Sequence, residues 1–237
     1  MITTDYMGLL IIAAVITLFA SAKVKSTFKK YAKVASMRGI TGAQAANKIL
    51  QENGLGDIQI RPVKGRLTDN YNPTNRTLNL SESVFANTSV AAIAVAAHEC
   101  GHAIQHKEGY SPMIWRAKLV PAANIGSKLG IPIIMLSWML GLNFRMADGS
   151  IFSLASIGIW LFSLSILFQL VTLPVEFDAS ARALKIIESN GTLEGVEMKG
   201  AKKVLTAAAL TYVAAAASAV MQLIRLILIN NDRKGRR

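Results

Sequence analysis

The stretch Ala91–Gln105 reads AAIAVAAHECGHAIQ and carries the pentapeptide His98-Glu99-Cys100-Gly101-His102 inside an alanine-rich run. Two histidines four residues apart on a helix are separated by about 6 Å along its axis, so both imidazoles can bind a single zinc ion. A glutamate beside the first histidine can take a proton from a water molecule that the zinc ion activates. The pattern therefore predicts zinc-dependent hydrolysis of peptide bonds, with His98 and His102 as metal ligands and Glu99 as general base.

The residues around the pentapeptide predict one uninterrupted helix. Asn87, Thr88 or Ser89 can cap its start, Val90–Lys107 contains no proline, and Gly109 provides a stop just beyond. The alternative is a buried helix whose histidines only form hydrogen bonds. We favour metal binding, because the two histidines and the glutamate occur together in a helical context.

The composition predicts a membrane protein. Apolar residues make up 52 % of the 237 residues and charged residues 17 %, and long apolar stretches carry most of that excess. A helix that crosses a bilayer needs about 20 mostly apolar residues. Four segments are candidates: Tyr6–Ala22, Gly126–Phe144, Ile151–Val175 and Val204–Ile229. The third is free of charge, whereas Lys128 and Arg225 in the second and fourth have long side chains that can reach the lipid headgroups.

The first apolar segment ends in Ala20-Ser21-Ala22, which resembles a signal-peptidase site. No Lys or Arg precedes it, Asp5 is acidic, and five lysines follow: Lys23, Lys25, Lys29, Lys30 and Lys33. This polarity is the reverse of a secretory signal. We therefore expect a retained anchor with its N-terminus outside.

The net charge of +12 does not indicate nucleic-acid binding. Of the 26 Lys and Arg residues, 14 lie between Lys23 and Lys118 and 5 between Glu176 and Lys203, in loops that the positive-inside rule places in the cytoplasm. No aromatic-basic nucleic-acid motif is present, so membrane lipid and a protein or peptide substrate are the expected partners. The basic tail Arg233–Arg237 would lie outside if all four segments cross. Either the fourth segment folds back or the tail is an exception.

The chain has a single cysteine, Cys100, so no disulfide can form within it. Cys100 is offset from the two histidines around the predicted helix. We expect it to pack in the core rather than bind metal.

The residues before the motif helix predict a small α+β unit. The expected elements are a basic amphipathic helix (Val24–Arg38), a helix capped by Thr41 (Ala43–Asn53), a strand (Ile58–Val63), a turn-rich segment (Asp69–Asn75), a second strand (Arg76–Leu80) and a short helix (Glu82–Ala86). The fold class is therefore an α-helical integral membrane protein with a small α+β, zincin-like catalytic unit at the membrane surface.

A catalytic zinc ion usually has three protein ligands and one open position. His106 continues the spacing of four, but on an unbroken helix it would lie about 12 Å from His98, too far for one ion. Three alternatives stay open for His106: it supports the ligands, it faces the substrate, or it simply lies at the solvated end of the helix. The third ligand should therefore be a carboxylate from elsewhere in the chain.

Glu176 is the strongest candidate for that ligand. It directly follows the charge-free segment Ile151–Val175, where a charge is costly without a partner, and it opens a helical run. The second and third apolar segments form an out-and-back hairpin, which returns Glu176 to the side of His98. Alternatively, Glu176 could cap a helix or pair with Arg182. Asp178 is the next candidate, as a ligand or as a partner that orients a histidine ring.

Several motifs together resemble the YugP-like family of bacterial membrane zinc metallopeptidases. They are Asn70-Tyr71-Asn72-Pro73, Leu80-Ser81-Glu82-Ser83-Val84, Ala91–Gln105 and Glu176-Phe177-Asp178-Ala179-Ser180, and the resemblance extends over most of the chain. The order of parts is also similar to that of HtpX-type membrane proteases, whose second motif reads Glu-x-x-Ala-Asp. Glu176 and Ala179 match that motif, but Ser180 stands where the aspartate would be. The resemblance implies proteolysis at a bacterial plasma membrane.

These observations predict five regions. They are a membrane anchor (residues 1–22), a cytoplasmic catalytic region (23–118), a transmembrane hairpin (119–175), a third-ligand helix and loop (176–203), and a C-terminal membrane helix with a basic tail (204–237). One zinc ion per chain is expected, held by His98, His102 and Glu176. An extended substrate could pair with the edge of the strand around Arg76–Leu80.

The donor that would stabilise the oxyanion stays open among Tyr71, Tyr110, His106, Arg182 and Tyr212. The main alternative function is a non-catalytic, zinc-stabilised membrane scaffold or adaptor. A di-metal carboxylate bundle is disfavoured because clustered carboxylates are scarce. An intramembrane protease is also disfavoured, because the motif lies outside the apolar segments.

Overall fold

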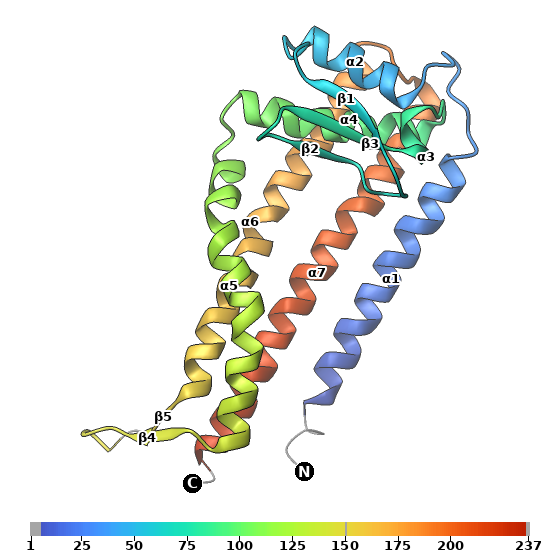
Figure 1. The fold of residues 1–237 in the computed structure, drawn as a ribbon. Coiled ribbons are helices and arrows are strands. Elements are labelled where there is room, and N and C mark those ends of the chain that lie inside the picture. The colour runs from blue at the N-terminus through green and yellow to red at the C-terminus, as the bar shows by residue number, and fades with distance from the viewer. Residues whose placement is uncertain (1–5, 150, 236–237) are drawn as a thin grey trace. The chain divides into compact units, whose positions relative to one another are not determined.

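The computed structural model describes residues 6–149 and 151–235. Asp5 and, from the basic tail, Arg236 and Arg237 lie outside the described residues. The helices are α1 (Met7–Tyr31), α2 (Gly42–Glu52), α3 (Glu82–Phe85), α4 (Val90–Lys107), α5 (Ser111–Leu140), α6 (Leu154–Ser189) and α7 (Gly195–Gly235) (Figure 1). The strands are β1 (Gln59–Val63), β2 (Asn70–Asn72), β3 (Thr77–Ser81), β4 (Asn143–Arg145) and β5 (Ile151–Ser153).

The chain divides into two units. A mixed unit comprises Ala20–Met113 and Leu173–Thr211, and a helical unit comprises the described parts of Met1–Phe19, Ile114–Thr172 and Tyr212–Arg237. Within the described residues, four helices are long and apolar enough to cross a membrane: α1, α5, α6 and α7. Each of these helices contains most of one apolar segment identified from the sequence. The predicted bounds Gly126–Phe144 and Ile151–Val175 were too wide at the connection between them, where residues 143–145 and 151–153 form strands.

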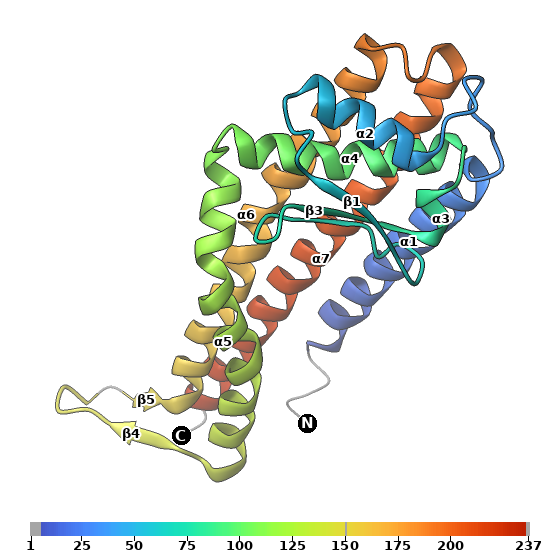
Figure 2. The ribbon, with the colours of Figure 1, turned by 45° about the horizontal axis from the view of Figure 1, so that its top comes forward.

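Helix α4 forms the centre of the mixed unit, as predicted for Val90–Lys107. The Ser89 hydroxyl accepts a hydrogen bond from the Ala92 backbone N–H and so caps its first turn. Almost the whole helix is buried, since its alanines leave room for neighbours to approach from several directions. Helix α2 packs against it and β2 and β3 contact it (Figure 2).

Helix α2 begins where the sequence indicates. The Thr41 side chain accepts from the Gln44 backbone N–H, and the Gln44 side chain accepts from the Thr41 N–H, which completes a capping box. Its apolar face, Ala45, Ala46, Ile49 and Leu50, is buried as predicted. Cys100 is fully buried and its thiol contacts the Ala46 carbonyl oxygen, consistent with packing.

The small sheet has the order β1-β3-β2, with β1 parallel and β2 antiparallel to β3. Both predicted strands are present. The expected edge role of Arg76–Leu80 is wrong, because β3 lies between two neighbours and has no free edge. The free edge nearest α4 belongs to β2, inside the segment Asp69–Asn75 that was predicted to be rich in turns, with no strand assigned to it.

Three predicted helix boundaries differ from the structure. The anchor and the basic helix Val24–Arg38 are one helix ending at Tyr31, because no breaker separates them and the backbone of Val34–Ser36 instead pairs with Thr88–Val90. Glu176 lies inside α6 rather than opening a helix, so it is not a helix cap. Helix α7 already begins at Gly195, within the segment expected to be a loop.

In the helical unit, α5 and α6 approach closely at glycines. A Cβ on Gly126 would lie 2.1 Å from the Leu161 carbonyl oxygen, and one on Gly158 would lie 2.7 Å from that of Gly130. Small residues allow such contact between membrane helices. The connection between α5 and α6 contains the β4–β5 hairpin, which the sequence analysis did not identify.

Candidate metal centre

Two histidines and a glutamate converge inside the mixed unit. His98 and His102 come from α4 and Glu176 from α6. Glu176 Oε2 lies 3.3 Å from His98 Nε2 and 3.5 Å from His102 Nε2. One ligand atom from each residue lies within 4.8 Å of the others. The three side chains are almost buried, with exposed fractions of 9 %, 8 % and 2 %.

Gly101 brings the two helices together at this point. A Cβ at position 101 would lie 2.5 Å from the Ala179 carbonyl oxygen, so only glycine allows α4 to pass α6 so closely. Gly101 lies beside His102, and Ala179 lies one helical turn after Glu176. The close crossing therefore places the carboxylate against both imidazoles.

Hydrogen bonds fix the protonation of His102. Gln105 Nε2 donates to the Val175 carbonyl oxygen at 2.8 Å and to Asp178 Oδ2 at 2.7 Å. Both partners accept, so the amide oxygen of Gln105 must face His102 Nδ1, 3.0 Å away. His102 therefore carries a proton on Nδ1 and donates from it, so Nε2 is the ring nitrogen that could bind a metal ion.

Ser180 provides the corresponding partner for His98. Its hydroxyl oxygen lies 3.1 Å from His98 Nδ1 and can accept the ring proton there. The sequence left the orienting partner open at this position. The structure places a serine hydroxyl where the related motif has an aspartate, so the ring of His98 still has a partner.

Asp178 does not join the cluster of ligand atoms. It accepts from Gln105 and from Arg182, and so orients His102 only through Gln105. Arg182 also pairs with Glu108. The sequence analysis missed Gln105 itself. Its position three residues after His102, on the same helix face, was the available signal.

Glu99 points from α4 toward the sheet. Its Oε2 accepts a hydrogen bond of 3.0 Å from the Tyr71 backbone N–H in β2. Burial raises the pKa of the Glu99 carboxyl group above its usual value, while the two neighbouring histidines oppose this shift. A buried carboxylate with a raised pKa, held by one backbone donor, is better able to accept a proton than an exposed carboxylate.

His106 lies outside the cluster and contacts Tyr71, the residue whose backbone N–H also bonds Glu99. The Tyr71 hydroxyl is 2.9 Å from His106 Nδ1. Tyr71 thus contacts Glu99 through its backbone and His106 through its side chain. Among the described residues the possible ligand cluster contains His98, His102 and Glu176 and leaves out His106.

The side chains present fit a zinc ion. Zinc prefers imidazole nitrogen and carboxylate oxygen, and its histidine ligands usually have a second partner at the other ring nitrogen. Both imidazoles here have such a partner at Nδ1, which leaves each Nε2 directed at the Glu176 carboxylate. The donor set and its surroundings agree with that preference.

Two histidines and a glutamate can hold a metal ion beside the buried Glu99, and the described residues form four helices long enough to cross a membrane. These features point to the class of membrane zinc metallopeptidases. A family model described as "Putative neutral zinc metallopeptidase" matches residues 6–231, and the chain belongs to that family. It is also 46 % identical over 224 residues to "Putative membrane protease YugP" of Bacillus subtilis (strain 168), covering 94 % of this chain and 96 % of the relative. No solved structure matches the chain.

Proposed function

We propose that this protein is a membrane-anchored endopeptidase in which His98, His102 and Glu176 hold one zinc ion and Glu99 is the general base. The observation that carries the proposal is the convergence of three ligand atoms within 4.8 Å, with both histidine Nδ1 atoms already partnered. When bound, zinc polarises the scissile carbonyl and makes a water molecule more acidic. Side chains of the protein would transfer the proton and position the substrate.

Glu99 takes the proton of the attacking water and delivers it to the leaving amine. The Tyr71 N–H holds one carboxylate oxygen, which fixes the direction of the other. Burial keeps the pKa of Glu99 raised, so the group can both accept and return a proton. Of the five donors left open by the sequence, we favour Tyr71 and His106 for the oxyanion, because Tyr71 also contacts Glu99.

An extended substrate would align along β2 rather than β3. In the antiparallel register Tyr71 faces Leu78, and its N–H points away from β3 toward Glu99. The outer edge of β2 therefore runs past the proposed base. Pairing of a peptide with such an edge would supply affinity from main-chain hydrogen bonds.

The proposed function also implies how the chain divides into a catalytic region and a membrane region. Residues 23–118 and 176–203 would form the zincin-like catalytic region, and residues 1–22, 119–175 and 204–237 the membrane region. The expected location is a bacterial plasma membrane, with the catalytic region facing the cytoplasm.

Two variants of the full chain test the assignment. Glu99→Gln should keep zinc bound and abolish cleavage of a labelled casein, because it removes only the base. Glu176→Ala should lose zinc as well as cleavage. Zinc content is measured by elemental analysis on protein in detergent. Full cleavage by Glu99→Gln would refute the mechanism, and metal-dependent stability without any cleavage in the unaltered chain would favour the scaffold.

A further inference from the structure

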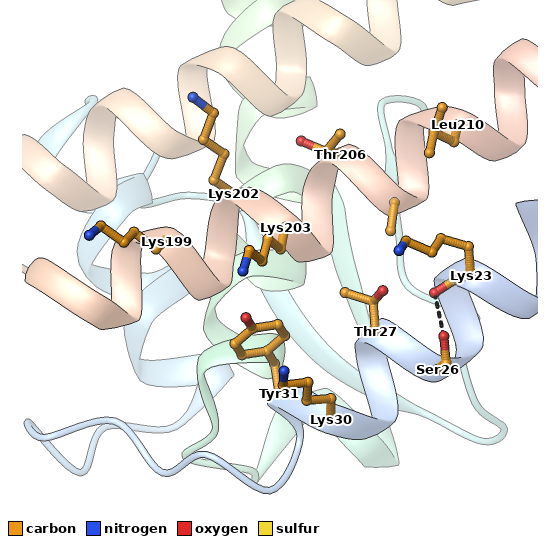
Figure 3. Close-up of a pocket in the computed structure, with 11 residues that line it drawn as sticks. Lys23, Ser26, Thr27, Lys30, Tyr31, Lys199, Lys202, Lys203, Thr206 and Leu210 are labelled. Carbon is orange, nitrogen blue, oxygen red and sulfur yellow. Dashed lines mark hydrogen bonds between the residues drawn. The ribbon is translucent and has the colours of Figure 1, made fainter.

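A cavity of about 710 Å³ lies in the mixed unit, between the C-terminal part of α1 and the N-terminal part of α7 (Figure 3). Five lysines line it: Lys23, Lys30, Lys199, Lys202 and Lys203. The rest of its lining is uncharged and contains no Asp or Glu. In Figure 3, Lys203 and Lys30 approach Tyr31 from opposite sides.

The charge of this cavity is not neutralised within the described part of the protein. None of the five lysines has a carboxylate within 4.0 Å there. Lys199 and Lys202 also line a neighbouring cavity with Glu188 and Glu194. Lys23, Lys30 and Lys203 do not line that neighbouring cavity. All three side chains are exposed, and an anion that binds among them would be attracted by each ammonium group.

The cavity lies where both helices change from charged to apolar sequence. In α1 no charged residue precedes Lys23, and in α7 none follows Lys203 until Arg225. Ala207 and Leu210 line the apolar side of the cavity. Lysines at the ends of two helices that can span a membrane are expected at the level of the lipid headgroups.

At the end of the cavity farthest from the apolar stretches, α1 and α7 are in tight contact. A Cβ on Gly200 would lie 2.8 Å from Tyr31 Cε1, so the glycine lets α7 rest directly on the tyrosine ring. Lys30 Nζ lies 5.7 Å from the centre of the same ring. The Tyr31 ring thus contacts both Gly200 of α7 and the Lys30 ammonium group, so its packing helps to define the shape of the cavity.

We propose that this cavity binds the phosphate group of an anionic phospholipid. The ammonium groups of Lys23, Lys30 and Lys203 would hold the phosphate, and the acyl chains would continue past Ala207 and Leu210 along the apolar part of α7. A free phosphate would use the lysines but gain nothing from the apolar side. The site is separate from the metal centre and does not depend on the proposed function.

The test uses the full chain in detergent and phosphatidylglycerol as the probe, with retained lipid counted by native mass spectrometry. The triple variant Lys23→Gln, Lys30→Gln, Lys203→Gln should bind the lipid on the order of a hundred-fold more weakly, since each lysine near a lipid phosphate contributes about five-fold. A second triple variant, Lys25→Gln, Lys29→Gln, Lys33→Gln, loses the same charge at positions outside the cavity. It should bind within a few-fold of the unaltered chain.

Arginine at the same three cavity positions should restore binding, and this keeps the test informative if the glutamine variant does not fold. Equal weakening by the two glutamine variants would mean a diffuse basic surface and would overturn the proposal. Displacement of the lipid by inorganic phosphate at similar concentrations would assign the site to a soluble anion instead. Displacement by an acidic peptide alone would assign it to a protein partner.

Discussion

The variant Gly101→Ala tests whether the crossing of α4 and α6 sets the metal centre. The new Cβ would lie 2.5 Å from the Ala179 carbonyl oxygen, which is about 1 Å short of the 3.4 Å at which ordinary contact begins. The obstacle is backbone, so a side-chain rotation cannot relieve it. The helices must separate, and Glu176, one turn from Ala179, must move away from the imidazoles.

The expected magnitudes follow from that displacement. Overpacking costs about 1–3 kcal/mol, while replacing a helical glycine by alanine returns about 1 kcal/mol. The free energy of unfolding should therefore fall by only about 0–2 kcal/mol. A ligand displaced by about 1 Å is far more costly for catalysis, and cleavage should fall on the order of a hundred-fold.

The assay compares thermal unfolding, zinc affinity by chelator competition and casein cleavage in the same preparations. Gly8→Ala is the matched control, because Gly8 lies in α1 and a Cβ there meets nothing within 4 Å. It should leave zinc affinity and cleavage unchanged and should raise the free energy of unfolding by no more than about 1 kcal/mol. If Gly101→Ala keeps both its zinc affinity and its cleavage rate, the close crossing does not position Glu176 and the reasoning fails.

Three further predictions follow from the structure. Gln105→Leu removes the acceptor at His102 Nδ1 and should weaken zinc binding about 10- to 100-fold. Gln105→Glu retains an acceptor and should weaken zinc binding less. Equal losses in the two variants would contradict the orienting role of Gln105. Burial raises the pKa of Asp69 despite its bonds to Ser81, so its ionisation opposes folding. The stabilisation that protonated Asp69 contributes to the folded state is fully present below the pKa of the unfolded chain, near 3.8. This stabilisation is lost as the pH rises through the raised pKa of the folded state. Denaturation across that window should show Asp69→Asn gaining stability relative to the unaltered chain, and a constant difference would exclude the effect. Removing zinc with a chelator should lower the melting temperature, since a ligand at a thousand times its Kd stabilises by about 4 kcal/mol, and Glu176→Ala should not respond.

The sequence was sufficient for features that depend on neighbours along the chain. The bounds of α4 follow from the Ser89 cap and the absence of proline, and α2 follows from the Thr41 cap and its apolar stripe. The four apolar helices follow from composition. The shared face of His98 and His102 follows from the helical repeat alone.

Glu176 required an argument about what was missing. It was selected because two histidines leave a catalytic zinc ion one ligand short, and the structure brings its carboxylate to the two imidazoles. The same reasoning could not find Gln105. Its role depends on the Val175 carbonyl and Asp178, which lie 70 and 73 residues away in sequence.

Tertiary packing alone decided the order of the sheet, the glycine crossing and the lysine cavity. Local patterns predicted β3 but not that β1 and β2 would occupy both its edges, because strand order depends on pairing between distant segments. Lys30 and Lys203 belong to helices at opposite ends of the chain. Helical periodicity fixes which residues share a face, but only packing at residues such as Gly101 and Gly200 decides which faces meet.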